Sequence, residues 1–235
     1  MAGARPLLLV TGIADGLGAS IAAAFAVAGY DVLGLARSSK SAGRVGSLVA
    51  RAGSTYTHLC CDLTRAADVA ATLESHVSGV SVVIHNAHKL LIKSFDQIDV
   101  AEFEGTWRVT CLGAITVARL VLPHMVAAGK GTIILTGATA GLRGNAGFSA
   151  FASAKFALRG LAQSLAREYG PSGIHVAHVV LDGLIDEPQT ERRFGPAQSM
   201  RMDPDAVAQT YVNLVDQDPP CWTHELDLRP FTERF

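Results

Sequence analysis

A glycine-rich turn near the amino terminus constrains this chain more than any other feature of its sequence. The apolar run Leu7–Val10 leads into a turn that contains Gly12, Gly16 and Gly18, and an Ala-rich stretch with helical periodicity follows over Leu17–Ala28. Glycine permits a sharp turn and a close approach of the backbone to a ligand. A strand that turns directly into a helix presents backbone amides and the positive helix end to an anion. The turn is therefore either a tight connection or a pyrophosphate site, and its position favours the second.

Short apolar runs recur along the chain, with helical stretches between them, notably Phe103–Met125 and Ser149–Tyr169. The candidate strands are Leu7–Val10, Asp31–Leu35, Thr55–Leu59, Val80–His85, Thr132–Thr136, His175–Leu181 and His224–Leu228. Strands that alternate with helices imply a parallel sheet covered on both faces. We therefore expect an α/β fold, a Rossmann-type doubly wound parallel sheet of about seven strands with helices on both faces.

Composition points to one domain that acts on small molecules. Of the 235 residues, 49% are hydrophobic and 17% are charged, which suits a single large core over residues 1–235. The formal net charge of -1 provides no broad field for nucleic acid or an anionic membrane. We expect a small-molecule substrate as the partner.

The cysteines and the first apolar run indicate a cellular compartment. Cys60, Cys61, Cys111 and Cys221 match neither a disulfide framework nor a zinc ribbon, so we expect no metal and buried free thiols in a reducing environment. Leu7–Val10 is too short to be a signal or membrane-spanning segment. These features predict a cytoplasmic protein without a membrane partner.

The spacing TGxxxGxG over residues 11–18 resembles the short-chain dehydrogenase/reductase family rather than the GxGxxG pattern of other dehydrogenases. Further matches follow in order along nearly the whole chain. Asp62 follows the third strand, Asn86-Ala87 follows the fourth, and Lys155 stands where that family has the lysine of YxxxK. The ordered set is more specific than any single motif, and it implies a nicotinamide dinucleotide cofactor.

The resemblance assigns cofactor binding to residues at the ends of the strands. They are Gly12, Ala14, Asp15, Gly16, Leu17, Gly18, Arg37, Ser38, Asp62, Leu63, Asn86, Ala87, Lys155, Gly183 and Ile185. The second strand ends without a carboxylate, and Arg37 with Ser38 can hold a 2′-phosphate by charge-assisted hydrogen bonds. NADP(H) is therefore favoured. NAD(H) remains an alternative because Asp15 would repel a nearby phosphate.

The catalytic residues that the resemblance implies are mostly replaced. In the family a tyrosine transfers a proton, a lysine four residues later lowers the pKa of that tyrosine, and a serine binds the substrate oxygen. Here Phe151 stands for the tyrosine, Ala138 for the serine, and Thr110 for an asparagine that supports the lysine, so only Lys155 is retained. Loss of a general acid costs roughly 100- to 10,000-fold in rate.

Two neighbouring side chains offer partial substitutes for the missing groups. Thr139, next to Ala138, could orient a substrate oxygen. His88 replaces a glycine beside the expected nicotinamide site, and an imidazole can donate a proton near neutral pH. The alternative for His88 is an ordinary hydrogen bond in a loop. Asp182, after the sixth strand, is expected to cap the next turn rather than to catalyse.

Three functions remain open at this point. The first is an oxidoreductase with an altered proton relay. The second is a different reaction, such as elimination, isomerisation or hydride transfer to carbon, with Phe151 and Ala138 forming a floor for an apolar or aromatic substrate and Phe148 and Leu184 near its walls. The third is a cofactor-binding protein without catalysis, acting as a sensor or assembly partner.

Two further features concern the substrate and assembly. The segment at about 184–202 is polar and lacks helical periodicity, and it resembles the mobile substrate lid of the family. The two long helices carry more apolar surface than one sheet contact covers. By analogy with the family, we expect a homodimer or homotetramer.

Overall fold

Seven parallel strands form one sheet at the centre of the molecule. The computed structural model describes residues 5–232, so the ends of the expected domain, residues 1–4 and 233–235, lie outside the described residues. The strands are β1 Leu7–Thr11, β2 Asp31–Ala36, β3 Tyr56–Cys60, β4 Val80–His85, β5 Gly131–Thr136, β6 Ile174–Leu181 and β7 Glu225–Leu228. Their order across the sheet is β3-β2-β1-β4-β5-β6-β7. The expected Rossmann-type α/β fold is confirmed.

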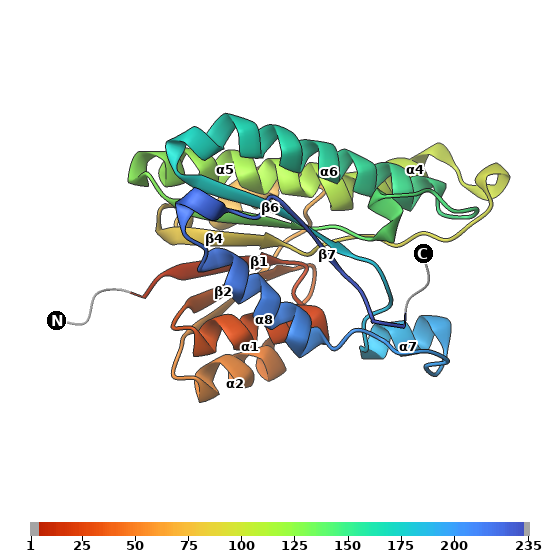
Figure 1. The fold of residues 1–235 in the computed structure, drawn as a ribbon, viewed down its shortest axis with the longest axis horizontal. Helices are drawn as coiled ribbons and strands as arrows, with labels where there is room; N and C mark the ends of the chain where they lie inside the picture. Colours follow the sequence, from red (N-terminus) through yellow and green to blue (C-terminus); the bar gives the residue numbers. More distant parts are fainter. Residues whose placement is uncertain (1–4, 233–235) are drawn as a thin grey trace.

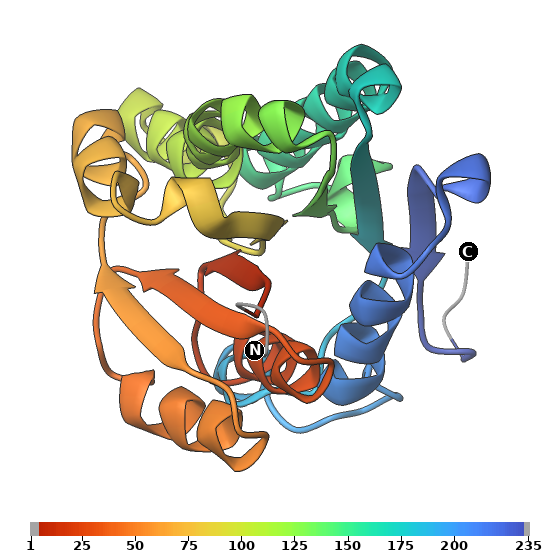
Figure 2. The ribbon, with the colours of Figure 1, turned by 90° about the vertical axis from the view of Figure 1, so that its left-hand side faces the viewer.

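Helices cover both faces of this sheet (Figure 1). The α-helices of the described residues are α1 Leu17–Val27, α2 Ala42–Arg51, α3 Ala66–Leu73, α4 Val100–Trp107, α5 Gly113–Ala128, α6 Ser149–Tyr169, α7 Pro188–Phe194 and α8 Pro204–Val215, of which α7 lies beyond the end of the sheet. The layer with α1, α2 and α8 lies on one face and the layer with α4, α5 and α6 on the other, as the view along the sheet in Figure 2 also shows. Each layer closes its own hydrophobic core against the sheet.

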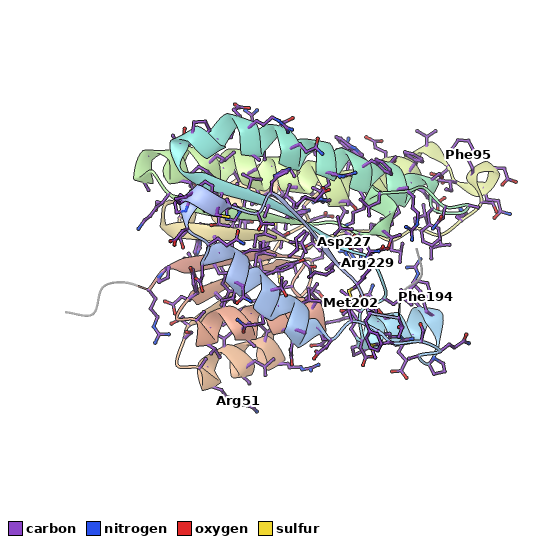
Figure 3. The ribbon with its side chains drawn as sticks, in the orientation of Figure 1. Arg51, Phe95, Phe194, Met202, Asp227 and Arg229 are labelled. Atoms are coloured by element: carbon purple, nitrogen blue, oxygen red, sulfur yellow. The ribbon has the colours of Figure 1, made fainter. Side chains whose placement is uncertain are left out.

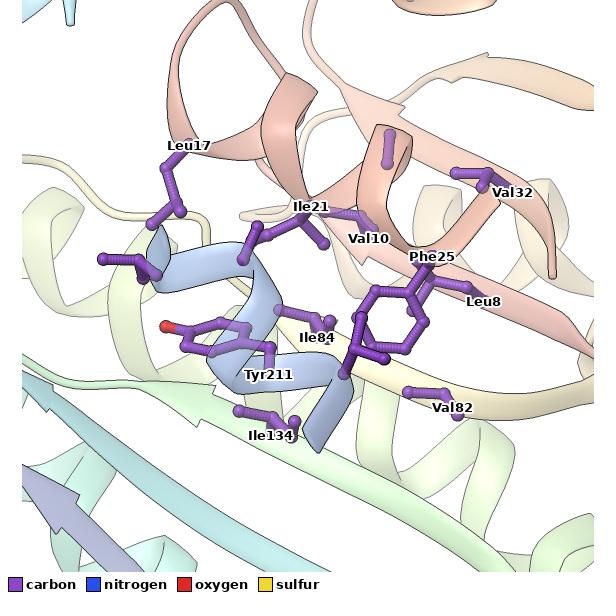
Figure 4. Packing of buried hydrophobic residues seen from close by; sticks show 14 of the residues in the cluster. Leu8, Val10, Leu17, Ile21, Phe25, Val32, Val82, Ile84, Ile134 and Tyr211 are labelled. Carbon is purple, nitrogen blue, oxygen red and sulfur yellow. The ribbon is translucent and has the colours of Figure 1, made fainter. Parts of the chain in front are cut away.

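The core under α1 and α8 positions the glycine-rich turn. Phe25 of α1 and Tyr211 of α8 are fully buried against Ile84 of β4 (Figure 4). The Tyr211 hydroxyl lies 3.1 Å from Oγ1 of Thr136, so its polar end is paired. Burying each aromatic side chain stabilises the fold by roughly 1.5–3 kcal/mol. This packing holds α1 close behind β1 and so fixes where α1 begins.

The expected helix Phe103–Met125 has different bounds and is interrupted. It begins at Val100 because Asp99 caps it: the Asp99 carboxylate accepts the amide of Glu102 at 2.7 Å. A π-helical turn, Arg108–Leu112, separates α4 from α5. The helix ends at Ala128, where Gly129 adopts a left-handed conformation.

By length and composition alone, the continuous helical stretch from Val100 to Ala128 is apolar enough to cross a membrane. Core helices of globular proteins meet the same criterion. Here Val117, Val121 and Met125 are buried in the core between α5 and the sheet. This burial accounts for the apolar character of the helix.

The strand order reverses its direction of winding between β1 and β4. β1 pairs with β2 on one side and with β4 on the other, and Thr11 lies beside His85 at the end of that second pair. At such a reversal the connections after the two strands leave toward opposite faces, which opens a crevice at their carboxyl ends. Many, but not all, of the predicted site residues line this crevice.

Candidate functional site

A cleft of about 370 Å³ opens at the carboxyl ends of β1, β2 and β4. Sequence-predicted residues that line it are Gly12, Ala14, Asp15, Gly18, Arg37, Ser38, Asp62, Leu63, Asn86, Ala87 and His88. Among the described residues, other predicted ones lie outside this lining, namely Gly16, Leu17, Thr110, Ala138, Thr139, Phe151, Lys155, Gly183 and Ile185. The predicted residues in this lining come from four distant segments of the chain, which meet at one edge of the sheet.

Gly12 is required by a close approach between two strand ends. Its φ of +70° suits glycine, and a Cβ placed on it would lie 2.5 Å from the Cα of Ala87. The loop that carries Ala87 is tied to the turn, because the Asn86 amide donates to the Thr11 carbonyl at 3.2 Å. The Asn86 side-chain amide also donates to the Gly12 carbonyl at 3.4 Å.

The start of α1 has a carboxylate of the same chain on its first amide. Gly16, with φ +100°, precedes the helix and gives it no side-chain cap. The amide of Leu17 instead donates to the Glu187 carboxylate at 3.1 Å. Because a carboxylate already lies on this amide, the site suits a negatively charged group such as a phosphate. Sequence reasoning missed Glu187, since nothing in the sequence around it indicates a contact with α1.

At the other end of the cleft, Arg37 and Ser38 follow β2. Asp15, which argued against a phosphate there, lies 3.4 Å from the guanidinium of Arg44 in α2. The positive charge of Arg44 opposes that of Asp15, which weakens the objection to a 2′-phosphate. Arg44 was also missed, because its position on the first turn of α2 cannot be read from spacing.

Asp62 lies on the wall of the cleft and is ordered by its own turn. Its Oδ1 accepts the backbone amide and the hydroxyl of Thr64, each at 2.9 Å. The backbone hydrogen bond is the largest cause that holds the pKa of Asp62 below its ordinary value. The carboxylate is therefore ionised and fixed in direction at neutral pH.

Lys155 and Phe151 lie together on α6, one helical turn apart. Lys155 is 2% exposed, and its Nζ donates to the Thr136 carbonyl at 2.6 Å. The same Nζ lies 5.6 Å from the centre of the Phe151 ring. Burial lowers the pKa of Lys155 to about 7. This lysine thus changes between its charged and neutral forms near neutral pH.

His88 lies beside Phe151, with 5.9 Å between the ring centres. Its Nδ1 is 3.2 Å from the Asn86 carbonyl, which can only accept, so Nδ1 carries the proton and Nε2 is left as an acceptor. The ring is exposed and lines the cleft. Desolvation by the cleft walls, followed by the charge of Lys155, shifts the pKa of His88 below its ordinary value. At neutral pH this geometry favours an acceptor rather than the expected proton donor.

Thr139 and Asp182 form a pair behind the cleft. The Thr139 hydroxyl donates to Asp182 Oδ1 at 2.5 Å, so its proton is committed to the carboxylate. Asp182, which is buried, also lies 3.7 Å from Arg143 and 3.5 Å from Arg229. Asp182 is therefore the centre of an ion-pair cluster, whereas a turn cap was expected.

Thr110 is buried in the π-helical turn. Its hydroxyl accepts the Lys89 amide at 3.3 Å, and its carbonyl lies 3.1 Å from Nε2 of His85. His85, in turn, lies 2.9 Å from the Thr11 hydroxyl. Thr110 thus supports the loop that carries His88.

An apolar cluster surrounds Phe151. Ala140, Phe151 and Ala152 are its buried members, and Leu90, Ala138 and Phe148 pack against them. Leu184, expected near the walls, is 42% exposed and is not part of this cluster. The positions that would carry the tyrosine and serine of the resemblance therefore form an apolar patch beside a buried lysine.

Comparison with known proteins relates this arrangement to one family. The sequence model described as short chain dehydrogenase matches residues 6–194. The chain is 31% identical to a 3-alpha-(or 20-beta)-hydroxysteroid dehydrogenase of Mycobacterium tuberculosis (strain ATCC 25618 / H37Rv), over 89% of this chain and 82% of that protein. It is 30% identical to the peroxisomal multifunctional enzyme A of Dictyostelium discoideum, over 90% of this chain but only 50% of that protein. The chain thus spans about half the length of this second relative.

A solved short-chain dehydrogenase from Rhodopseudomonas palustris has the same architecture. It superimposes with a TM-score of 0.83 and is 32% identical in sequence, with 97% of this chain and 100% of that chain covered. The agreement therefore includes the sheet, both helical layers and the cleft edge.

Proposed function

This chain belongs to the short-chain dehydrogenase/reductase family, and on that premise we propose that it is an NADP(H)-dependent oxidoreductase whose proton transfer does not pass through a tyrosine. The observation that carries the proposal is the cleft at the reversal of the sheet, where Gly12, Arg37 and Asn86 meet. The family residues that this chain lacks are the tyrosine and the serine, replaced by Phe151 and Ala138. Both act on the substrate rather than on the cofactor. This division supports a retained cofactor site with altered chemistry.

A nicotinamide dinucleotide bound in the cleft would supply or accept a hydride. The α1 amides would hold its pyrophosphate, and Arg37 with Ser38 would hold a 2′-phosphate. Lys155 would place positive charge beside the nicotinamide ribose. His88, neutral with Nε2 as acceptor, would receive a hydrogen bond rather than protonate a carbonyl.

We assign the substrate to the apolar or aromatic class. The cluster around Phe151 offers hydrocarbon surface where other members of the family would place hydroxyl groups. Reduction of a carbon–carbon double bond places its proton on carbon, from water, rather than on a carbonyl oxygen, so it needs less help from a hydroxyl relay than carbonyl reduction does. The segment 184–202 would act as the lid that selects the substrate.

A cofactor-binding protein without catalysis is the second candidate. The burial of Lys155 Nζ on the Thr136 carbonyl favours it, because this hydrogen bond points the amine at the protein backbone. Nicotinamide absorbance separates the two candidates, with NADPH supplied to ketones, enals and quinones and NADP+ supplied to alcohols. Substrate-dependent oxidation of NADPH or reduction of NADP+ supports the enzyme, and no change over the whole panel supports the binding protein.

The cofactor preference is tested by replacing Arg37 with alanine. We expect NADPH binding to weaken about 10- to 100-fold and NADH binding to change little, because a charge-assisted hydrogen bond contributes roughly 1.5–3 kcal/mol. Titration followed by nicotinamide fluorescence measures both. Arg51→Ala is the matched control, since Arg51 is an exposed arginine at the far end of α2 (Figure 3). Equal losses for NADPH and NADH would contradict the assignment of Arg37.

We propose a homodimer or homotetramer that uses the surface of α5 and α6. An apolar groove there is lined by Leu122, Val126, Leu161, Leu165 and Tyr169, among others. Homo-oligomers of this kind bury apolar helix surface.

Val126→Glu tests this interface. Val126 is 38% exposed in the groove, so a charge there should leave the fold intact but shift the protein to a smaller mass in analytical ultracentrifugation. Val27→Glu, at an 80% exposed position on α1, should leave the mass unchanged. A wild-type protein that sediments as a monomer at micromolar concentration would contradict the proposal.

We also propose that residues 1–235 act as one domain in the cytoplasm. The four cysteines are free thiols in this structure, a state that a reducing compartment would maintain. Cys61 and Cys111 are buried, but Cys60 and Cys221 are exposed, so the expectation that all four are buried was wrong.

A further inference from the structure

The chain itself supplies an anion to the phosphate site. Glu187 immediately precedes α7, and its Oε2 accepts the Leu17 amide at the start of α1 at 3.1 Å. A Cβ placed on Gly16 would clash with the same carboxylate oxygen, so the carboxylate lies directly on the turn. Glu187 also lines the cleft together with Gly12 and Asn86.

Helix α1 has this one carboxylate where most helices have a cap. Its cap residue is a glycine without a side-chain hydrogen bond, and its first turn contains no acidic residue. The positive end of the helix therefore attracts the Glu187 carboxylate as it would attract a phosphate. Two anions cannot occupy the same amide without strong repulsion.

Two elements hold Glu187 in this position. On one side, the Asp186 amide donates to the Met202 carbonyl and the Met202 amide donates to the Leu184 carbonyl, each at 2.8 Å. On the other side, α7 begins, and its Glu191 amide donates to the Glu187 carbonyl at 3.1 Å. Phe194 and Met202 in Figure 3 mark the far end of α7 and the base of the segment. A shift of α7 alone would withdraw the carboxylate while the base stays anchored.

Burial supports this assignment of the carboxylate to an enclosed site. Desolvation raises the pKa of Glu187 above its ordinary value, while the hydrogen bond from Leu17 and the charge of Arg192 oppose that rise. The half-buried carboxylate thus lies on a helix end, in the cleft that would receive the cofactor.

We propose that Glu187 is an internal competitor of the cofactor phosphates, so that a dinucleotide binds only as this carboxylate leaves the α1 amides. The inference depends on the proposed function, because it assumes that the cleft takes a nucleotide. Glu187 then sets the affinity for the cofactor and couples its binding to the position of α7 and the 184–202 segment.

Titration of the full chain with NADPH tests the competition. Glu187→Gln keeps the length of the side chain but removes its charge, and we expect NADPH to bind about 3- to 30-fold tighter, the range that a charge at a helix end produces. Glu187→Ala should act in the same direction. Glu191→Gln is the matched control, since Glu191 is an exposed acid on the same helix and should leave the affinity unchanged.

A second ligand separates failure of the inference from failure of the proposed function. Adenosine 2′-phosphate lacks the pyrophosphate, so wild type and Glu187→Gln should bind it equally. If both proteins bind adenosine 2′-phosphate and NADPH with unchanged affinities, the competition is overturned while the cofactor site stands. If neither protein binds either nucleotide, the proposed function is overturned and the inference with it.

Discussion

Replacing Phe151 with tyrosine and Ala138 with serine in the same chain is expected to raise carbonyl reductase activity roughly 100-fold or more. The reason is the geometry around Lys155, whose Nζ lies 5.6 Å from the Phe151 ring centre. A phenol on that ring would gain a cationic neighbour that lowers its pKa. Proton transfer by a positioned side chain contributes roughly 100- to 10,000-fold to rate.

The measurement is kcat/KM for NADPH oxidation with a series of small ketones. Phe148→Tyr, in the same apolar cluster, is the control, because it adds a hydroxyl at a position that does not match the family's tyrosine. The control should show no gain. If the double variant also fails to reduce any ketone while it still binds NADPH, the pocket has been remodelled beyond the two side chains, and the account of a single missing relay is wrong.

The difference in the free energy of unfolding between the wild type and the variant Lys155→Met is expected to depend steeply on pH. Burial lowers the pKa of Lys155 from 10.5 to about 7 in the folded protein. Between these values the unfolded chain binds more protons than the folded one, so the free energy of unfolding of the wild type rises with pH. Between pH 8 and 10, Lys155 raises the free energy of unfolding of the wild type by about 1 kcal/mol per pH unit. The methionine variant lacks this contribution.

At or below pH 7 the buried ammonium destabilises the wild type most, so the free energy of unfolding of the variant should be highest relative to the wild type there. This relative value should fall as the pH rises. Urea denaturation at pH 6, 8 and 9.5 measures the difference. Lys130→Met, at an exposed position, should follow the wild type at every pH. A constant difference between wild type and Lys155→Met over this range would contradict the buried, easily deprotonated lysine.

Much of the fold could be predicted from the sequence because its signals are local. Apolar β-branched runs such as Val80–His85 and Ile174–Leu181 are long enough to be recognised as buried strands. The glycine turn could be placed because its TGxxxGxG spacing lies within one short segment directly after an apolar run. The interruption of the long helix at Arg108–Leu112 could not, since a π-helical turn leaves the apolar pattern almost unchanged.

The candidate site was only partly predictable, because several of its properties arise from contacts across the fold. Glu187 meets Leu17 from 170 positions away, and no spacing encodes that pair. The protonation of His88 depends on the Asn86 carbonyl and on Lys155, which the fold brings together. Asp182 became an ion-pair centre because Arg143 and Arg229 reach it from different segments. The motifs therefore predicted where a residue lies in the fold better than they predicted its protonation state and its hydrogen-bond or ion-pair partners.

Titration of the wild-type chain with NADPH and with NADH, followed by nicotinamide fluorescence and thermal shift, tests the central claim most directly. The account predicts saturable binding of NADPH, a raised melting temperature in its presence, and weaker binding of NADH. Absence of binding by both dinucleotides would contradict it, because the glycine-rich turn would then serve only the architecture of the fold.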